Sequence, residues 1–224
     1  MMNKDYILRM AERFGRMLAI ILHLRQSNKH EEALISIDDI YLQTTGFTAS
    51  FVNSASEEML LQMIAPLGVL NVQKCMWIAL LLKEEGDIYV EMGNEDESYY
   101  RYLKSLHFFL AAAKQDDEVK DIDINSAIEY DLAALEAYEV PQKTKLALFN
   151  YFGAIGNYGR AEDMLFEAIE TEEAVEGPVE VGIIEQGRAF YKELESKSEA
   201  DLEAGGMSRR EVEEGLAELN RKGK

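Results

Sequence analysis

The residues that could coordinate a metal ion are few and scattered. The histidines and the single cysteine are His23, His30, His107 and Cys75. There is no Glu-x-x-His pair, so neither a di-iron bundle nor a zinc site has its ligands. Residues 121–125 have the 1-3-5 spacing of a calcium loop, but Ser126 replaces the required glycine and Leu132 the bidentate acid. We therefore predict no metal and no cofactor, and interpret 121–125 as the start of a helix.

Catalytic patterns are equally weak. The chain has no phosphate-binding glycine loop, and Gly153, Gly156 and Gly159 fall within a predicted helix–turn–helix and do not follow a strand. It has no Gly-x-Ser-x-Gly elbow, and Cys75 lies in an apolar stretch, which favours a buried, inert thiol. Pairs of carboxylates are common in so acidic a chain and mostly indicate solvated helix faces. We predict that the protein is not an enzyme.

The charge argues against two classes of partner. With 23 basic and 42 acidic residues, the formal charge is −19, which opposes binding to nucleic acid and to anionic membranes. Residues 1–30 differ, because they contain six basic and two acidic residues. The simplest interpretation is that this basic first helix docks on the acidic body of its own chain or is simply solvated; an acidic partner is the alternative.

Cysteine usage and hydropathy predict a cytoplasmic protein. One cysteine cannot form a disulfide framework within the chain, which fits a reducing compartment. The apolar run 17–24 is short and lacks a cleavage site, so it does not read as a signal peptide. The run 76–82 is too short to span a bilayer.

Apolar residues recur mostly at intervals of three and four, which predicts helices throughout. In the first segment Ile7, Met10, Phe14, Met17 and Ile21 share one face. Capping boxes are expected to start helices at Ser54–Glu57 and Ser208–Glu211, and Gly177–Val181 to lead into another. Further helices are predicted at about 33–41, 71–92, 95–114, 124–139, 142–155 and 158–172.

One pair of predicted helices carries a repeat pattern. The first contains Leu82-x3-Gly86-x2-Tyr89-x3-Gly93, and the second contains the positions Ser98, Tyr102 and Ser105. Because glycine and serine are small, the two helices can approach closely, with tyrosines filling the wedge between them. This pair resembles a tetratricopeptide repeat, with Glu85 where leucine is usual. Fainter copies at 17–37 and 148–168 have Ile21 and Phe149 in place of the small residue, so their helices should pack less closely.

A wider resemblance spans nearly the whole chain. Residues 3–10, 81–89, 203–206 and 211–216 resemble an uncharacterised bacterial family, typical of clostridia, whose function is unknown. This resemblance implies a bacterial cytoplasm and transfers no functional residue. The expected fold is all-α, a right-handed stack of helical hairpins like a tetratricopeptide-repeat solenoid with irregular extra helices. We expect a single domain over 1–224, with a weaker helical extension at 177–224.

The function expected of such a stack is protein binding. The first helix of each pair lines a concave groove that can hold a partner peptide or helix. By this register Lys83, Asp87, Lys143 and Asn150 face the groove. The alternative is a self-associating structural or regulatory protein, in which the broad apolar face of the first helix is buried in a homodimer without a groove ligand.

Overall fold

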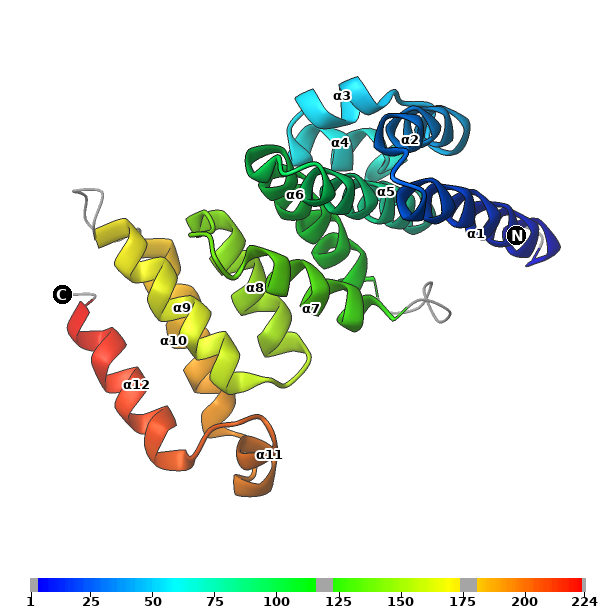
Figure 1. Cartoon of the computed structure of the whole chain (residues 1–224). Coiled ribbons are helices and arrows are strands. Elements are labelled where there is room, and N and C mark those ends of the chain that lie inside the picture. The colour runs from blue at the N-terminus through cyan, green and yellow to red at the C-terminus, as the bar shows by residue number, and fades with distance from the viewer. Residues whose placement is uncertain (1–3, 116–122, 174–180, 223–224) are drawn as a thin grey trace. The chain divides into compact units, whose positions relative to one another are not determined.

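A computed structural model describes the backbone of residues 4–115, 123–173 and 181–222 (Figure 1). Within these ranges every regular element is helical and no strand occurs, so the all-α prediction is confirmed. The helices are α1 Lys4–Gln26, α2 His30–Thr44, α3 Ala49–Ser54, α4 Glu57–Met63, the 3₁₀ helix η1 Pro66–Gly68, α5 Val72–Glu91, α6 Glu95–Ala113, α7 Ile124–Leu135, α8 Gln142–Ala154, α9 Tyr158–Glu173, α10 Val181–Glu195, α11 Glu199–Ala204 and α12 Arg209–Lys222.

The chain divides into two compact units. Unit 1 comprises Met1–Glu139 and contains α1 to α7, and unit 2 comprises Val140–Lys224 and contains α8 to α12. Each unit has its own buried apolar core, exemplified by Leu82 and Phe109 in unit 1 and by Phe152 and Leu165 in unit 2. The single repeat domain over 1–224, including its extension at 177–224, stays a prediction.

In unit 1 the most extensive contact between two helices is that of α5 with α6, the pair that carries the repeat pattern. A Cβ atom on Gly86 would lie 2.8 Å from the ring of Tyr102, a distance that real Cβ atoms do not adopt, so only glycine permits this approach. Ser105 is fully buried, and its hydroxyl donates a hydrogen bond of 2.9 Å to the carbonyl of Ala79. The small residues thus bring two backbones together, and the predicted close pairing is confirmed.

The remaining helices of unit 1 pack around this pair. α2 contacts α1 and α5, and α7 packs on α6. Phe14 of α1 stacks on Trp77 of α5 with ring centroids 5.6 Å apart. Arg25, near the end of α1, forms ion pairs with three carboxylates of α5. For this residue the predicted docking of the basic first helix on the acidic body is confirmed.

Unit 2 is built from the α8–α9 hairpin and from α10 and α12, which pack along it. α10 contacts α9 and α12, and Figure 1 shows these three helices side by side. Two glycines allow the contacts: a Cβ on Gly187 would lie 2.7 Å from Leu219, and one on Gly215 would collide with Tyr191. Close packing in unit 2 therefore depends on glycines in its C-terminal helices, which the repeat pattern did not include.

Two start signals had different outcomes. The box at Ser208 is confirmed, because its hydroxyl accepts from the Glu211 amide and Glu211 accepts from the Ser208 amide. The box at Ser54 is wrong: Ser54 ends the short helix α3, and Ser56 caps α4 by accepting from the Met59 amide. Both serines precede an apolar run at similar spacing, so sequence did not distinguish them. The short helices α3 and α11 were not predicted, and most of 177–181 lies outside the described residues.

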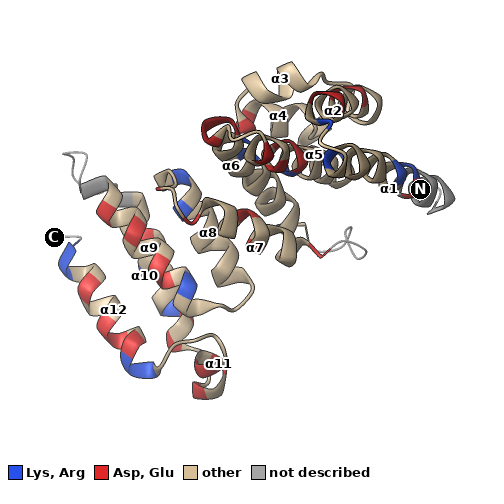
Figure 2. Cartoon of the chain, in the orientation of Figure 1, with Lys and Arg blue, Asp and Glu red and all other residues tan. Residues whose placement is uncertain are grey.

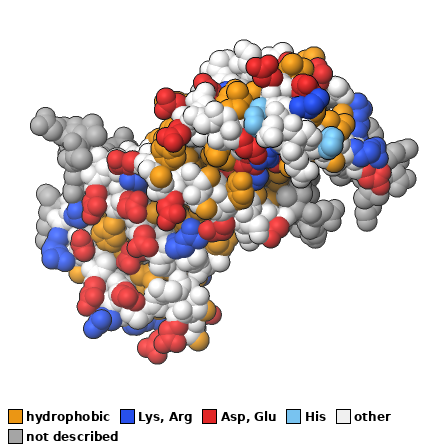
Figure 3. Space-filling view, in the orientation of Figure 1, with side chains coloured by type: hydrophobic (Ala, Val, Ile, Leu, Met, Phe, Trp, Pro, Cys, Tyr) orange, Lys and Arg blue, Asp and Glu red, His pale blue; other side chains and the backbone are white. Residues whose placement is uncertain are grey.

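Acidic residues occur on helices of both units. Figure 2 shows them along α2, α6, α9 and α12, with basic residues at both ends of α12. In the space-filling view of unit 2, acidic groups are spread among basic and polar ones without forming one continuous patch (Figure 3). In the described part of the chain, no helix combines the length and apolarity needed to cross a membrane.

Candidate functional site

The four residues predicted to face a groove lie in different units. Lys83 and Asp87 are on α5 of unit 1, and Lys143 and Asn150 are on α8 of unit 2. The two on α5 are largely buried, whereas the two on α8 are exposed. Each pair therefore has to be examined within its own unit.

In unit 1, Asp87 is the acceptor at the centre of a polar cluster drawn from four helices. Its Oδ1 accepts hydrogen bonds from the hydroxyls of Tyr102 on α6, at 2.6 Å, and Tyr130 on α7, at 2.8 Å. Its Oδ2 accepts from Arg25 on α1, at 2.9 Å, and from Lys83 on α5, at 3.1 Å. Four donors on one carboxylate tie α1, α6 and α7 to α5.

The charges of this cluster are mutually compensating. Burial alone would raise the pKa of Asp87, but hydrogen bonds from the two tyrosines and the nearby Lys83 and Arg25 lower it below its usual value. Burial would also lower the pKa of Lys83, but the charges of Asp87 and Glu84 raise it. Lys83 additionally lies over the ring of Tyr130, 3.9 Å from its centroid. The polar atoms of Lys83 and Asp87 are thus engaged within unit 1 and hold its helices together.

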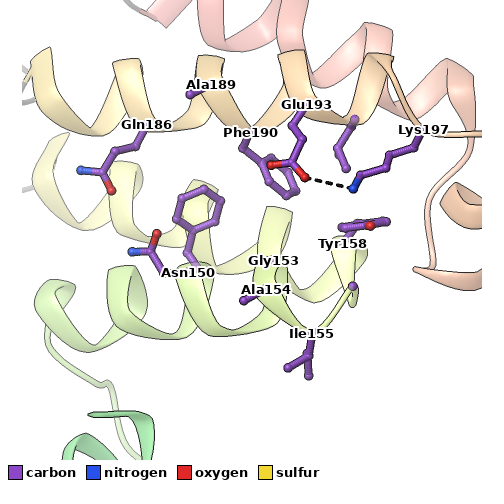
Figure 4. Close-up of a pocket in the computed structure, with 13 residues that line it drawn as sticks. Asn150, Gly153, Ala154, Ile155, Tyr158, Gln186, Ala189, Phe190, Glu193 and Lys197 are labelled. Atoms are coloured by element: carbon purple, nitrogen blue, oxygen red, sulfur yellow. Dashed lines mark ion pairs between the residues drawn. The ribbon is translucent and has the colours of Figure 1, made fainter. Parts of the chain in front are cut away.

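Unit 2 contains a groove between α8 and α10, with a pocket of about 560 Å³, a size typical of ligand-binding clefts. Three aromatic rings form its apolar wall (Figure 4). Phe149 and Phe190 meet edge to face with centroids 5.2 Å apart, and Tyr158 lies 6.4 Å from Phe190. The hollow exists because Gly153, Ala154 and Ala189 present little or no side chain at its edge.

Two primary amides lie at one end of this groove. Asn150 projects from α8 and Gln186 from α10, both toward the opening (Figure 4). The Asn150 amide nitrogen donates to the Leu146 carbonyl at 2.8 Å, which leaves its carbonyl oxygen as an acceptor. Gln186 is exposed and makes no hydrogen bond with the described residues. The groove therefore presents solvent-exposed amide groups beside an aromatic wall.

An ion pair marks the other end of the groove. Lys197 and Glu193 are 3.0 Å apart, one turn from each other (Figure 4). The Glu193 side chain keeps 69% of its exposure, so the pair is solvated. A hydrogen bond from Lys197 to Glu193 raises the pKa of Lys197. The charged lining residues thus compensate each other, and the groove has no net charge.

Tyr158 is fixed by the turn that follows α11. A Cβ on Gly205 would collide with the Tyr158 ring, and the Gly159 amide donates to the Gly205 carbonyl at 3.0 Å. Segments distant in sequence, at the start of α9 and after α11, thus fix one wall of the groove. This contact explains why sequence periodicity could not identify Tyr158 as a lining residue.

The site residues missed by sequence reasoning are Phe149, Tyr158, Gln186 and Phe190. In the repeat pattern Phe149 is only a bulky residue at a position where the repeat has a small one. In the structure it is 3% exposed and contacts Phe190 of α10. That mismatch was the available signal, because a large ring at a helix-contact position indicates that another element packs there. Lys143, although exposed on α8, does not line the pocket.

The described residues show no arrangement suited to a metal. Within residues 4–115, 123–173 and 181–222, no three His, Cys, Asp or Glu side chains come together as ligands. Cys75 is fully buried, its thiol lies 3.2 Å from the Phe108 carbonyl, and burial raises its pKa to about 12. Such a thiol is protonated at neutral pH and unreactive. The chemistry offered by the groove is apolar contact and hydrogen bonding.

Comparison with known proteins places the chain in a family without assigning it an activity. No curated protein matches the sequence. No solved structure matches it. One family does, over residues 1–224: "Family of unknown function (DUF6483)". Because the match covers the whole chain, the protein belongs to the DUF6483 family, as its resemblance to an uncharacterised family suggested.

Proposed function

We propose that the protein is a non-catalytic, cytoplasmic protein-interaction module built from tetratricopeptide-like hairpins, and that the α8–α10 groove of unit 2 holds a segment of a partner protein. The observation that carries this proposal is the pocket of about 560 Å³, in which Asn150 and Gln186 flank a wall of aromatic rings. Pockets of this kind combine apolar contact with a few oriented polar groups.

The chemistry of the groove favours an extended partner segment over a helix. Peptide groups inside a helix already bond to each other, so they cannot pair with side-chain amides. An extended backbone keeps its N–H and C=O groups available, and primary amides both donate and accept. An apolar side chain of the same segment would then contact Phe149 and Phe190. The formal charge of −19 makes nucleic acid and anionic lipid poor candidates.

The groove can be tested by filling it. Ala189 lies exposed on α10 and lines the pocket, so Ala189→Trp should occupy the space without disturbing the core. Ala217 is exposed on α12 and lies outside the pocket, so Ala217→Trp is the matched control for Ala189→Trp. In quantitative affinity capture from native cytoplasm, a partner should be retained by the wild type and Ala217→Trp and lost from Ala189→Trp. Equal retention by all three proteins would contradict the groove assignment.

A second candidate, self-association, is favoured by the surface of unit 1. Ile20 and Leu22 of α1 are 55% and 44% exposed, and Ile35 of α2 is 65% exposed. Apolar side chains on neighbouring helices could be covered in a symmetric dimer. Sedimentation separates the candidates, because a monomer at all concentrations excludes the dimer. A dimer that Leu22→Glu dissociates would place the interface on α1.

A further inference from the structure

Asp131 of α7 is a buried acid without a hydrogen-bond donor. Its side chain is fully inaccessible to solvent, and neither carboxyl oxygen has a hydrogen-bond partner in the described part of the chain. Burial of an ionised carboxylate in this state is strongly unfavourable, and such a group takes up a proton instead. Asp87 differs in this respect, because four donors surround it.

Two side chains of α6 lie near Asp131, and neither has a proton available to donate to it. On α6, Ser105 lies beside the carboxyl, but its hydroxyl proton is already donated to the Ala79 carbonyl. Tyr102 of α6 donates its proton to Asp87. A neutral Asp131 can itself donate to the oxygen of Ser105, whereas an ionised one finds no donor there.

The charges around Asp131 come from α5. Lys83 attracts the ionised carboxyl, but it is bonded to Asp87 at 3.1 Å and lies 3.6 Å from Glu84. Asp87 repels the ionised form. Burial, the largest effect, together with this repulsion, raises the pKa of Asp131 to about 8 despite the attraction of Lys83.

We propose that Asp131 is a proton-dependent latch, in which the neutral carboxyl keeps α7 packed on α5 and α6 and the ionised carboxyl releases it. On losing its proton, Asp131 competes with Asp87 for Lys83. If Lys83 moves to Asp131, it leaves Asp87 and the ring of Tyr130, which bind α7 to α5. If Lys83 stays, the unpaired charge drives Asp131 toward water. Both outcomes weaken the attachment of α7.

The sign of the effect follows from proton linkage. The unfolded chain has an ordinary Asp with a pKa of 3.8, and the folded protein holds the proton up to about pH 8. Between these values unfolding releases a proton, so raising the pH favours the unfolded state by up to about tenfold in the equilibrium constant per pH unit. Stability due to neutral Asp131 is lost as the pH rises through this window.

The test compares Asp131→Asn with Asp123→Asn in the full chain. Both residues are on or next to α7, but Asp123 is an exposed N-cap, a role that Asn also fills. Unfolding between pH 6 and pH 9 is followed by the fluorescence of Trp77, the single tryptophan, which lies in α5 of unit 1. The wild type and Asp123→Asn should lose stability over this range. In Asp131→Asn the unfolding equilibrium constant should rise less with pH than in the wild type, the difference being up to about tenfold per pH unit. Parallel curves for all three would overturn the proposal.

Two measurements on the wild type keep the proposal testable if Asp131→Asn does not fold. The carboxyl carbon resonance of Asp131 should titrate near pH 8, and titration near pH 4 would overturn the latch. Hydrogen exchange, corrected for its intrinsic pH dependence, should show lower protection of residues 124–135 at pH 9 than at pH 6.5, with α5 changing less. Unchanged protection of α7 across this range would mean that ionisation does not release the helix.

Discussion

The α5–α7 region of unit 1 and the α8–α10 region of unit 2 differ in how their polar side chains are used. In unit 1, Lys83, Tyr102 and Tyr130 all donate hydrogen bonds to Asp87, so these polar groups are paired inside the fold. In unit 2, Asn150 and Gln186 line the pocket, and both side-chain amides can still form hydrogen bonds with a partner. Polar residues on helices can thus stabilise one unit, or remain available for a partner in the other.

Residue size at the helix contacts accounts for this difference. Gly86 allows Tyr102 to lie directly against α5, so the two helices close over their polar groups. Phe149 instead reaches the ring of Phe190, and the neighbouring Gly153 and Ala154 leave an open groove. A small residue facing a large one closes the α5–α6 contact, whereas the two large rings of Phe149 and Phe190, which meet edge to face, leave space beside the α8–α10 contact.

The strongest challenge to this comparison is Asp87→Ala. The substitution leaves Arg25 and Lys83 with fewer counter-charges, and Tyr102 without its acceptor, in a buried setting. Loss of one member of such a cluster costs about 3–5 kcal/mol. Denaturant unfolding monitored by Trp77 fluorescence, which reports unit 1, should show this destabilisation. Asp39→Ala, at an exposed site on α2, is the control and should change the free energy by less than about 0.5 kcal/mol.

A pair of identical substitutions sharpens the comparison. Gly86→Ala places a Cβ 2.8 Å from Tyr102, whose ring is held by its bond to Asp87, so unit 1 should lose about 1–3 kcal/mol. In Gly153→Ala the new Cβ lies 3.7 Å from Phe190, an ordinary contact. Because alanine favours a helix over glycine, unit 2 should gain up to about 1 kcal/mol. Circular dichroism measures both, and Trp77 fluorescence should change only for Gly86→Ala. Equal losses in the two variants would refute the difference in packing.

The smallest effect on stability is expected at the groove. Asn150→Ala combined with Gln186→Ala removes two exposed amides, so the free energy of unfolding should change by less than about 0.5 kcal/mol. Partner capture should nevertheless fall, since these amides are proposed to pair with the partner backbone. A large loss of stability would show that the amides belong to the fold, as the polar groups around Asp87 do.

Most helices were predictable because their signals are local. Apolar spacing located α1, α5, α6 and α8 close to their observed bounds, and Ser208 with Glu211 marked the start of α12. The errors fall at α3 and α11, where short segments carry little periodicity, and at the end of α7, which stops at Leu135 and not near 139. Of the residues that line the candidate site, the sequence register named only Asn150, and it placed Asn150 in a groove shared with Lys83, Asp87 and Lys143, not in one between α8 and α10. It could not identify Gln186 or Phe190, because the approach of α10 to α8 has no signal in either helix alone.

The sequence by itself determined a helical chain with a close α5–α6 contact at Gly86, since periodicity and residue size act within one hairpin. Only the tertiary structure decided which polar residues are satisfied. Lys83 and Asp87 are bonded within unit 1, Asp131 is buried without a donor, and Asn150 lies at an open groove. Hydrogen-bond satisfaction depends on what neighbouring helices place within about 3 Å of an atom, and spacing along one helix does not specify that.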